Sequence, residues 1–233
     1  MHKLIRSSLA AGLLAAPMLA NAEISANVAL TSDYVWRGVS QTLEDPAIQG
    51  GFDYAHDSGF AAGVWASNVD FYETGDIDDD GADMELDLYA SYGGEFGNGI
   101  GYSVGLIYYM YPETDPGVDI DWLEFNAGLS YGPVSFAINY TSDFINSGDD
   151  AIYYSLGGEH EINGFTLAAA VGYYDLSDTG ADPDGYIDWK LGVSTSFVGL
   201  DWDLSYTDTN GDGEDLFGDL ADGRAVLTVS KSF

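Results

Sequence analysis

The stretch Ala225-Val-Leu-Thr-Val-Ser-Lys-Ser-Phe233 decides the fold. Ala, Leu, Val and Phe stand at odd positions, whereas Thr and two Ser stand at even ones. Alternation with a period of two predicts a β-strand with one apolar and one polar face. A strand of this kind that stops on an aromatic residue is expected to close a membrane barrel by pairing with the first strand. The alternative is the edge strand of a soluble β-sandwich.

The same alternation recurs in eleven earlier segments of the chain. They are residues 24–36, 47–56, 59–69, 84–92, 100–110, 123–131, 134–140, 152–156, 165–173, 187–193 and 198–206. The pattern is clearest at 84–92, where Met, Leu, Leu, Ala and Tyr alternate with Glu, Asp, Tyr and Ser. With the closing stretch, twelve strands are predicted.

The connections between these segments alternate in length. Short connections lie at 56–59, 93–99, 132–133, 161–164 and 197–199, and long acidic ones at 37–46, 70–83, 111–121, 142–150, 174–186 and 207–223. A sandwich has no reason to place every long loop on alternate turns, but outer-membrane barrels carry short periplasmic turns and long extracellular loops. The sequence therefore predicts an all-β, antiparallel, up-and-down transmembrane barrel with both chain ends on the periplasmic side.

Tyrosines on the apolar face of the predicted strands support this prediction. Tyr92, Tyr102, Tyr131, Tyr140, Tyr173 and Tyr206 share that face and tend towards strand ends. Aromatic girdles occupy these positions in membrane barrels, because the ring is apolar and the hydroxyl reaches the headgroups.

Residues 1–22 have the pattern of a secretory signal peptide. Lys3 and Arg6 precede a short apolar run, and Ala20-Asn-Ala22 forms a small-residue cleavage site. The run is too short to span a bilayer, and Pro17 interrupts it. We expect cleavage after residue 22, export to the bacterial outer membrane, and a barrel over residues 23–233.

The charge of residues 23–233 excludes some partners. This part carries all 39 acidic residues and only four basic ones, Arg37, Lys190, Arg224 and Lys231. Nucleic acid is excluded, because it repels an anionic protein. The expected partners are outer-membrane lipid and small solutes or cations. There is no cysteine, so the sheet must hold the fold without disulfides.

Three motifs resemble a known family. They are Leu30-Thr-Ser-Asp-Tyr-Val-Trp-Arg-Gly-Val-Ser-Gln-Thr42, Gly63-Val-Trp-Ala-Ser-Asn-Val69 and Glu85-Leu-Asp-Leu-Tyr-Ala-Ser-Tyr92. In these motifs the chain resembles the TorF family of proteobacterial porins, and the similarity extends over essentially all of residues 23–233. The resemblance implies an outer-membrane barrel and implies no particular site residues.

The alternation also assigns an inward face. It holds the carboxylates of Asp33, Asp53, Glu85, Asp87, Glu124, Glu159, Asp188, Asp201 and Asp203, together with Arg37, Lys190 and Arg224. Rings of carboxylates favour cations, so we expect a narrow, cation-preferring pore for passive diffusion of ions or small solutes. The alternative is a non-conducting barrel, plugged by its own side chains, whose acidic loops serve adhesion or surface structure.

The closing strand predicts a contact at the barrel mouth. Because the first and last strands run antiparallel, Arg224 should approach Arg37. We expect the two arginines to anchor the loops or narrow the mouth, with ion pairs to Asp33 or loop aspartates.

Two acidic loops have the spacing of calcium loops, with oxygen ligands at alternate positions and a glycine at the sharp turn. One has Asp76, Asp78, Asp80 and Asp87, and the other Asp208, Asn210, Asp212 and Asp219. The alternative is incidental spacing in solvated loops. No other cofactor is expected.

An enzyme is not expected. A nucleophilic serine needs an adjacent base, and the only histidines after residue 22, His56 and His160, fall at short turns. Ordinary turn histidines explain them.

Overall fold

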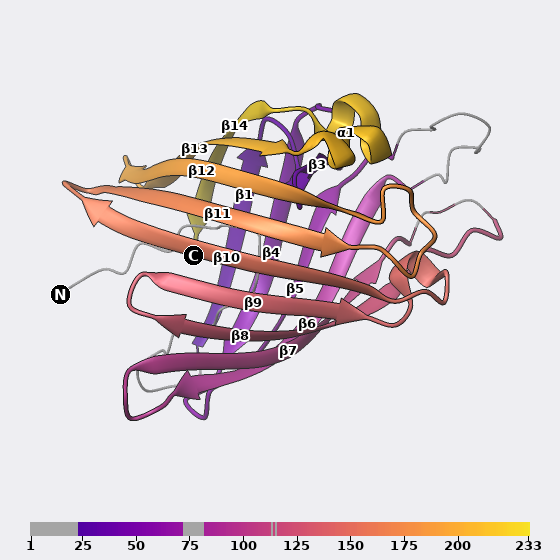
Figure 1. Cartoon of the computed structure of the whole chain (residues 1–233). Coiled ribbons are helices and arrows are strands. Elements are labelled where there is room, and N and C mark those ends of the chain that lie inside the picture. The colour runs from indigo at the N-terminus through magenta and orange to yellow at the C-terminus, as the bar shows by residue number, and fades with distance from the viewer. Residues whose placement is uncertain (1–22, 72–81, 113, 115) are drawn as a thin grey trace.

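The computed structural model describes residues 23–71, 82–112, 114 and 116–233. In this part of the chain, twelve antiparallel strands form a closed barrel (Figure 1). They are β1 (Glu23–Thr31), β4 (Ala47–Ala55), β5 (Phe60–Asn68), β6 (Met84–Glu95), β7 (Ile100–Met110), β8 (Trp122–Tyr131), β9 (Val134–Thr141), β10 (Ala151–Ile162), β11 (Phe165–Asp175), β12 (Gly185–Phe197), β13 (Leu200–Thr209) and β14 (Arg224–Ser232). The predicted fold class and strand number are confirmed.

The seam between β1 and β14 closes the barrel. Leu30 pairs with Val229 and Asn27 with Ser232, and Ala26 and Phe233 exchange backbone hydrogen bonds of 2.9 and 3.3 Å. β1 also pairs with β4, and β14 also pairs with β13. The stretch 225–233 therefore serves as the closing strand that its alternation predicts.

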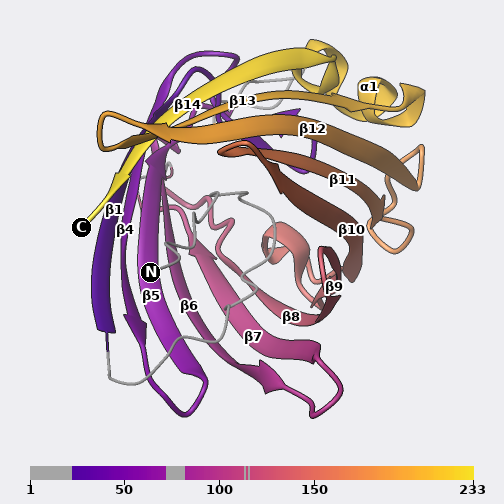
Figure 2. The same ribbon diagram turned by 90° about the vertical axis from the view of Figure 1, so that its left-hand side faces the viewer.

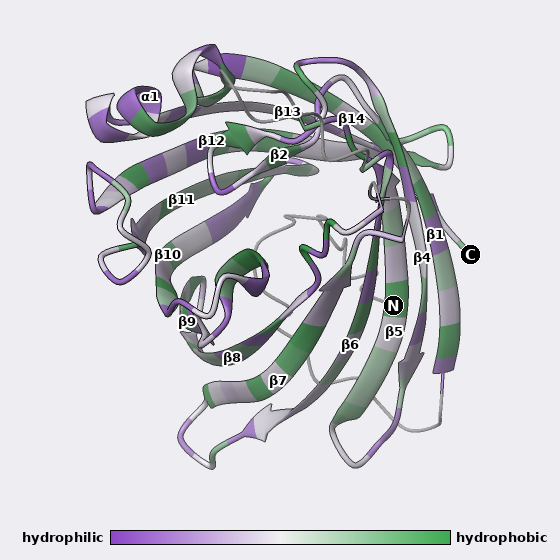
Figure 3. Ribbon diagram, turned by 90° about the vertical axis from the view of Figure 1, so that its right-hand side faces the viewer, coloured by the Kyte–Doolittle hydropathy of each residue, from purple (hydrophilic) through white to green (hydrophobic). Residues whose placement is uncertain are grey.

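The two faces of the sheet differ as the alternation predicts. Leu88, Val104, Leu191 and Leu204 point outwards and are exposed, whereas Ser91, Ser103, Ser194 and Ser205 point inwards and are buried. Hydropathy accordingly changes from residue to residue along each strand (Figure 3). Five of the six predicted girdle tyrosines are exposed, and the sixth, Tyr102, is half-buried.

The connections separate into two ends (Figures 1 and 2). Short turns lie at one, here called the short-turn end, and the longer connections lie at the long-loop end. The β10–β11 turn shows how the sequence sets a short connection. Asn163 and Gly164 adopt φ of 52° and 83°, which are the left-handed values that an Asn-Gly hairpin turn requires.

The first predicted segment, 24–36, is too long. β1 ends at Thr31, and residues 32–46 turn into the barrel instead of forming an outward loop. This inserted segment contains a small hairpin, β2 (Val35–Trp36) and β3 (Val39–Ser40). Arg37 and Gly38, at φ of 49° and 84°, make its turn, which the alternation of residues 24–36 conceals.

Two of the other long connections contain short helices. One 3-10 helix (Phe144–Asn146) follows β9, and α1 (Gly211–Phe217) with a second 3-10 helix (Gly218–Ala221) joins β13 to β14. Among the described residues, no helix is long and apolar enough to cross a membrane.

The cost of a charged substitution on the exposed apolar face should depend on its depth in the bilayer. Leu204 lies near the middle of β13, and Leu204→Arg should lower the free energy of unfolding by about 2–4 kcal/mol, the cost of an arginine at the bilayer midplane. Phe197→Arg, at the end of β12, should cost about 0–1 kcal/mol. Urea titrations in lipid vesicles would measure both. Equal losses would contradict a membrane belt.

Candidate functional site in the barrel lumen

The segment 32–46 crosses the lumen near the long-loop end. Tyr34 packs edge-on to Trp65 of β5, with ring centroids 5.4 Å apart. On the opposite wall, the hydroxyl of Tyr186 on β12 donates to the carbonyl of Arg37 at 2.9 Å. Strands on both sides of the barrel therefore hold this segment in the lumen.

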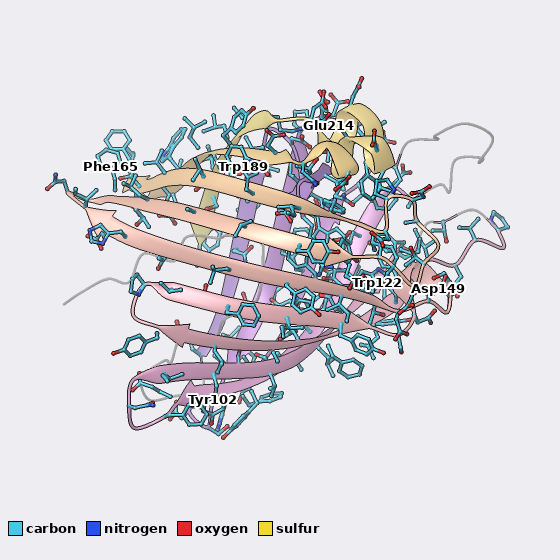
Figure 4. All side chains as sticks on the ribbon, viewed as in Figure 1. Tyr102, Trp122, Asp149, Phe165, Trp189 and Glu214 are labelled. Carbon is cyan, nitrogen blue, oxygen red and sulfur yellow. The ribbon has the colours of Figure 1, made fainter. Side chains whose placement is uncertain are left out.

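Aromatic side chains fill the space around the hairpin in two buried clusters. One contains Tyr34, Ala47, Val69, Ala82, Tyr109, Tyr111 and Trp122, and the other contains Val39, Ala151, Tyr153, Tyr174, Leu176, Tyr186 and Ala221. Trp36 packs against both, with ring contacts to Trp122 at 6.2 Å and Tyr174 at 5.9 Å. Figure 4 places Trp122 towards the long-loop end, far from Tyr102 and Phe165 at the other. The lumen is therefore packed at the long-loop end.

Arg37 lies at the centre of this packing. Its guanidinium carbon is 4.1 Å from the ring centre of Trp36, 4.3 Å from that of Tyr153 and 4.6 Å from that of Tyr174. One of its nitrogens donates to Glu124 on β8. Burial favours the neutral form, but Glu124 offsets this and raises the pKa of Arg37 above its ordinary value. Arg37 is therefore a fully charged cation inside the barrel.

Tyrosine hydroxyls satisfy most of the buried carboxylates. Glu85 accepts from Tyr34 at 2.8 Å and from Tyr111 at 3.0 Å, and Asp188 accepts from Tyr153 at 3.0 Å. Burial, and next the negative charge of Glu85, raise the pKa of Tyr34 well above its ordinary value. Tyr34 therefore stays a neutral donor.

Asp87 differs from its neighbours. It is 9% exposed, and its Oδ1 is buried without a hydrogen-bond partner. Glu85 and Glu124 are close enough to repel it electrostatically. Among the buried carboxyl groups that the structure describes, Asp87 is therefore the one whose charge a bound cation would stabilise most.

Asp33 anchors the base of the inserted segment. Its Oδ1 accepts from the hydroxyls of Ser40 at 2.7 Å and Thr42 at 3.1 Å, and its Oδ2 accepts from Arg224 at 3.1 Å. Arg224 also lies 3.4 Å from Glu44. The predicted ion pair between Arg224 and Asp33 is confirmed.

The predicted meeting of Arg37 and Arg224 is wrong. Arg224 stays at the seam with Asp33, whereas Arg37 reaches Glu124 on β8, on the far wall of the barrel. The prediction placed Arg37 at the end of a continuous first strand. The hairpin turn at Arg37 and Gly38 carries the side chain across the lumen instead.

The remaining predicted lumen residues lie away from the hairpin. Lys190 and Asp203 attract each other on β12 and β13. Asp53 accepts from Tyr89 at 2.5 Å, and Asp201 accepts from Ser196 beside a short turn. Lys231 lies on the outward parity, 5.1 Å from the ring centre of Phe233.

The second predicted calcium loop forms the start of helix α1 and the short helix after it. Asn210 precedes α1 and bonds to Asp212 at 2.7 Å, and Asp219 lies in the helix that follows α1. Of the first loop, Asp76, Asp78 and Asp80 lie outside the described residues, and Asp87 lies within β6. Among the described residues, no group of three or more His, Cys, Asp or Glu side chains could hold a metal ion. Calcium binding stays a prediction.

Of the histidines that the structure describes, His56 follows β4, His160 lies near the end of β10 instead of in the predicted turn, and both are exposed. His56 Nδ1 is 2.9 Å from Ser58 Oγ and also accepts from the Ser58 amide at 3.1 Å. Both contacts belong to the exposed β4–β5 turn, so they stabilise that turn.

The aromatic residues that surround Arg37 are not among those predicted from the sequence. Tyr153, Tyr174 and Tyr186 stand on the polar parity of their strands, close to the long-loop end. Bulky rings on the inward parity at one end were the signal that could have indicated a packed lumen.

The protein is a closed barrel of twelve strands, and its exterior is apolar whereas its interior is polar and bears carboxylates. It has the fold of outer-membrane porins. The COG4313 outer membrane channel from Pseudomonas putida F1 has a TM-score of 0.56 at 11% identity, over 96% of this chain and 100% of that chain. The KdgM porin has a TM-score of 0.53 at 9% identity, over 90% and 99%. The NanC porin has a TM-score of 0.53 at 11% identity, over 89% and 98%.

The chain belongs to the Gcw_chp family, described as a bacterial protein of unknown function, which matches residues 15–233. No curated protein matches the sequence.

Proposed function

We propose that this protein is an outer-membrane channel for passive diffusion of ions or small solutes, with a preference for cations. The observation that carries the proposal is the composition of the lumen, where the carboxyl groups of Glu85, Asp87, Glu124 and Asp188 are buried together with the guanidinium of Arg37. Carboxylates lining a pore favour cations. The long loops would face outside, and the short turns the periplasm. The TorF-like motifs and the secretory pattern of residues 1–22 agree with this location.

Single-channel recordings in planar bilayers test the proposal. We expect a small conductance and, under a salt gradient, a reversal potential that indicates cation preference. Absence of conductance, or anion preference, would exclude it.

Asp87 should govern selectivity more than Glu85 does. Asp87→Asn removes a carboxylate without a hydrogen-bond partner at Oδ1, so cation preference should fall while the folded barrel is as stable as before or more stable. Glu85→Gln disturbs two tyrosine hydrogen bonds, so it should cost about 1–3 kcal/mol. Reversal potentials and urea titrations would compare them. A stability loss for Asp87→Asn equal to that for Glu85→Gln would contradict this assignment.

A non-conducting barrel is the second candidate. The packing of Trp36 between the two aromatic clusters favours it, because these rings occupy the long-loop end of the lumen. Its acidic loops would then serve adhesion or surface structure. Under this alternative the recordings show no current, and exchanging residues 207–223 abolishes surface binding.

A further inference from the structure

We infer that the cage around Arg37 is a recognition site for guanidinium cations, which Arg37 fills as a tethered ligand. The cage consists of the rings of Trp36, Tyr153 and Tyr174 and the carboxylate of Glu124. Its walls come from the inserted hairpin and from β8, β10 and β11. The binding inference stands by itself, and only its extension to a transported solute rests on the proposed function.

The chemistry of the cage fits a planar cation. Three ring centres lie 4.1, 4.3 and 4.6 Å from the guanidinium carbon, and Glu124 accepts from one nitrogen. Aromatic faces attract cations electrostatically, and a guanidinium is weakly hydrated and stacks on rings. The cage therefore selects a flat, delocalised cation over a compact ammonium.

Arg37 leaves one hydrogen-bond donor unsatisfied inside the cage. Its Nη1 is buried without a hydrogen-bond partner. A free guanidinium ion could rotate to present its N–H groups better, because no side-chain stem fixes its orientation. The cage therefore suits a guanidinium group in general better than it suits the tethered side chain of Arg37.

Turn preference does not explain an arginine at this position. Arg37 has φ of 49°, in the left-handed region where Asn or Gly is preferred in two-residue hairpins. Gly38, the next residue, is confined, because an added Cβ would lie 2.8 Å from the Cβ of Asp188. The turn therefore packs closely against β12. The contacts of the guanidinium group explain why an arginine stands at position 37.

The charge of the surrounding lumen would draw such cations to the cage. Glu85 and Asp87 lie on β6, and Asp188 lies on β12. The channel's substrates would then include small solutes that carry a guanidinium group and compete with Arg37 for the cage.

The test uses Arg37→Ala in the full-length folded barrel, with ethylguanidinium chloride as the probe. We expect saturable quenching of tryptophan fluorescence and a rising melting temperature at millimolar concentrations. Wild-type protein should need at least tenfold more probe, because the tethered side chain has a high effective concentration. Ethylammonium chloride should bind Arg37→Ala at least tenfold more weakly.

Arg224→Ala is the matched control, since Arg224 is bound by oxygens of Asp33, Glu44, Asp219 and Asp222. Its response should equal that of the wild type, and Arg37→Ala/Glu124→Gln should lose the response. Equal binding by wild type and Arg37→Ala, or by the double variant, would overturn the inference. If Arg37→Ala refolds poorly, its refolding yield should rise with ethylguanidinium and not with ethylammonium, and an unchanged yield would also overturn it. These readouts need no current, so a barrel that binds without conducting refutes the channel alone.

Discussion

Replacing Arg37 with alanine is expected to lower the free energy of unfolding by about 3–5 kcal/mol. The substitution leaves the carboxylate of Glu124, which is 2% exposed, without its counter-ion. An uncompensated buried charge has a cost of this size, whereas the intact pair contributes less than its Coulomb energy. Urea titration of the protein refolded into lipid vesicles would measure the loss.

Two further variants separate charge from packing. Arg37→Ala/Glu124→Gln should recover much of the loss, because the buried negative charge is gone. Arg224→Ala leaves Asp33 with its hydrogen bonds from Ser40 and Thr42, and the second partner, Glu44, is largely exposed, so this variant should cost less than Arg37→Ala. If Arg224→Ala and Arg37→Ala cost the same, the Arg37–Glu124 pair is not the main anchor of the hairpin.

Replacing residues 35–40 with a glycine-serine linker is expected to raise the single-channel conductance several-fold. The replacement removes Trp36 and Arg37 from between the aromatic clusters, so Glu124 loses its ion pair and the long-loop end of the lumen should open. Cation preference should increase as well, because the positive charge of Arg37 is lost.

A linker at residues 177–180, in the exposed β11–β12 connection, provides the control. It keeps the hairpin, so its conductance should equal that of the wild type. Heat-modifiable migration on a gel would establish that both variants are folded barrels. An unchanged conductance in the 35–40 variant would show that the hairpin does not limit the current.

The seam shows how far the sequence could predict the site. Parity placed Arg224 and Asp33 on the inward face, and the antiparallel pairing of β1 with β14 brings them together. Parity also placed Glu124 and Arg37 inside. Parity could not predict that they pair, because β1 ends at Thr31 and Arg37 lies in the turn of an inserted hairpin, which the alternation of residues 24–36 does not indicate.

Glu85 and Asp87 illustrate the same limit. They stand two residues apart with the same parity, so the sequence treats them alike. The structure separates them, since Tyr34 and Tyr111 donate to Glu85 and leave Asp87 Oδ1 without a partner. Those donors come from distant segments.

The sequence by itself determined the barrel. A period of two sets which side chains face out, and the alternation of short and long connections sets the meander, because both depend on neighbours along the chain. Only the tertiary structure decided what fills the lumen. The contacts of Arg37 join residues that lie up to 149 positions apart, and such contacts depend on how the closed barrel folds one loop inwards.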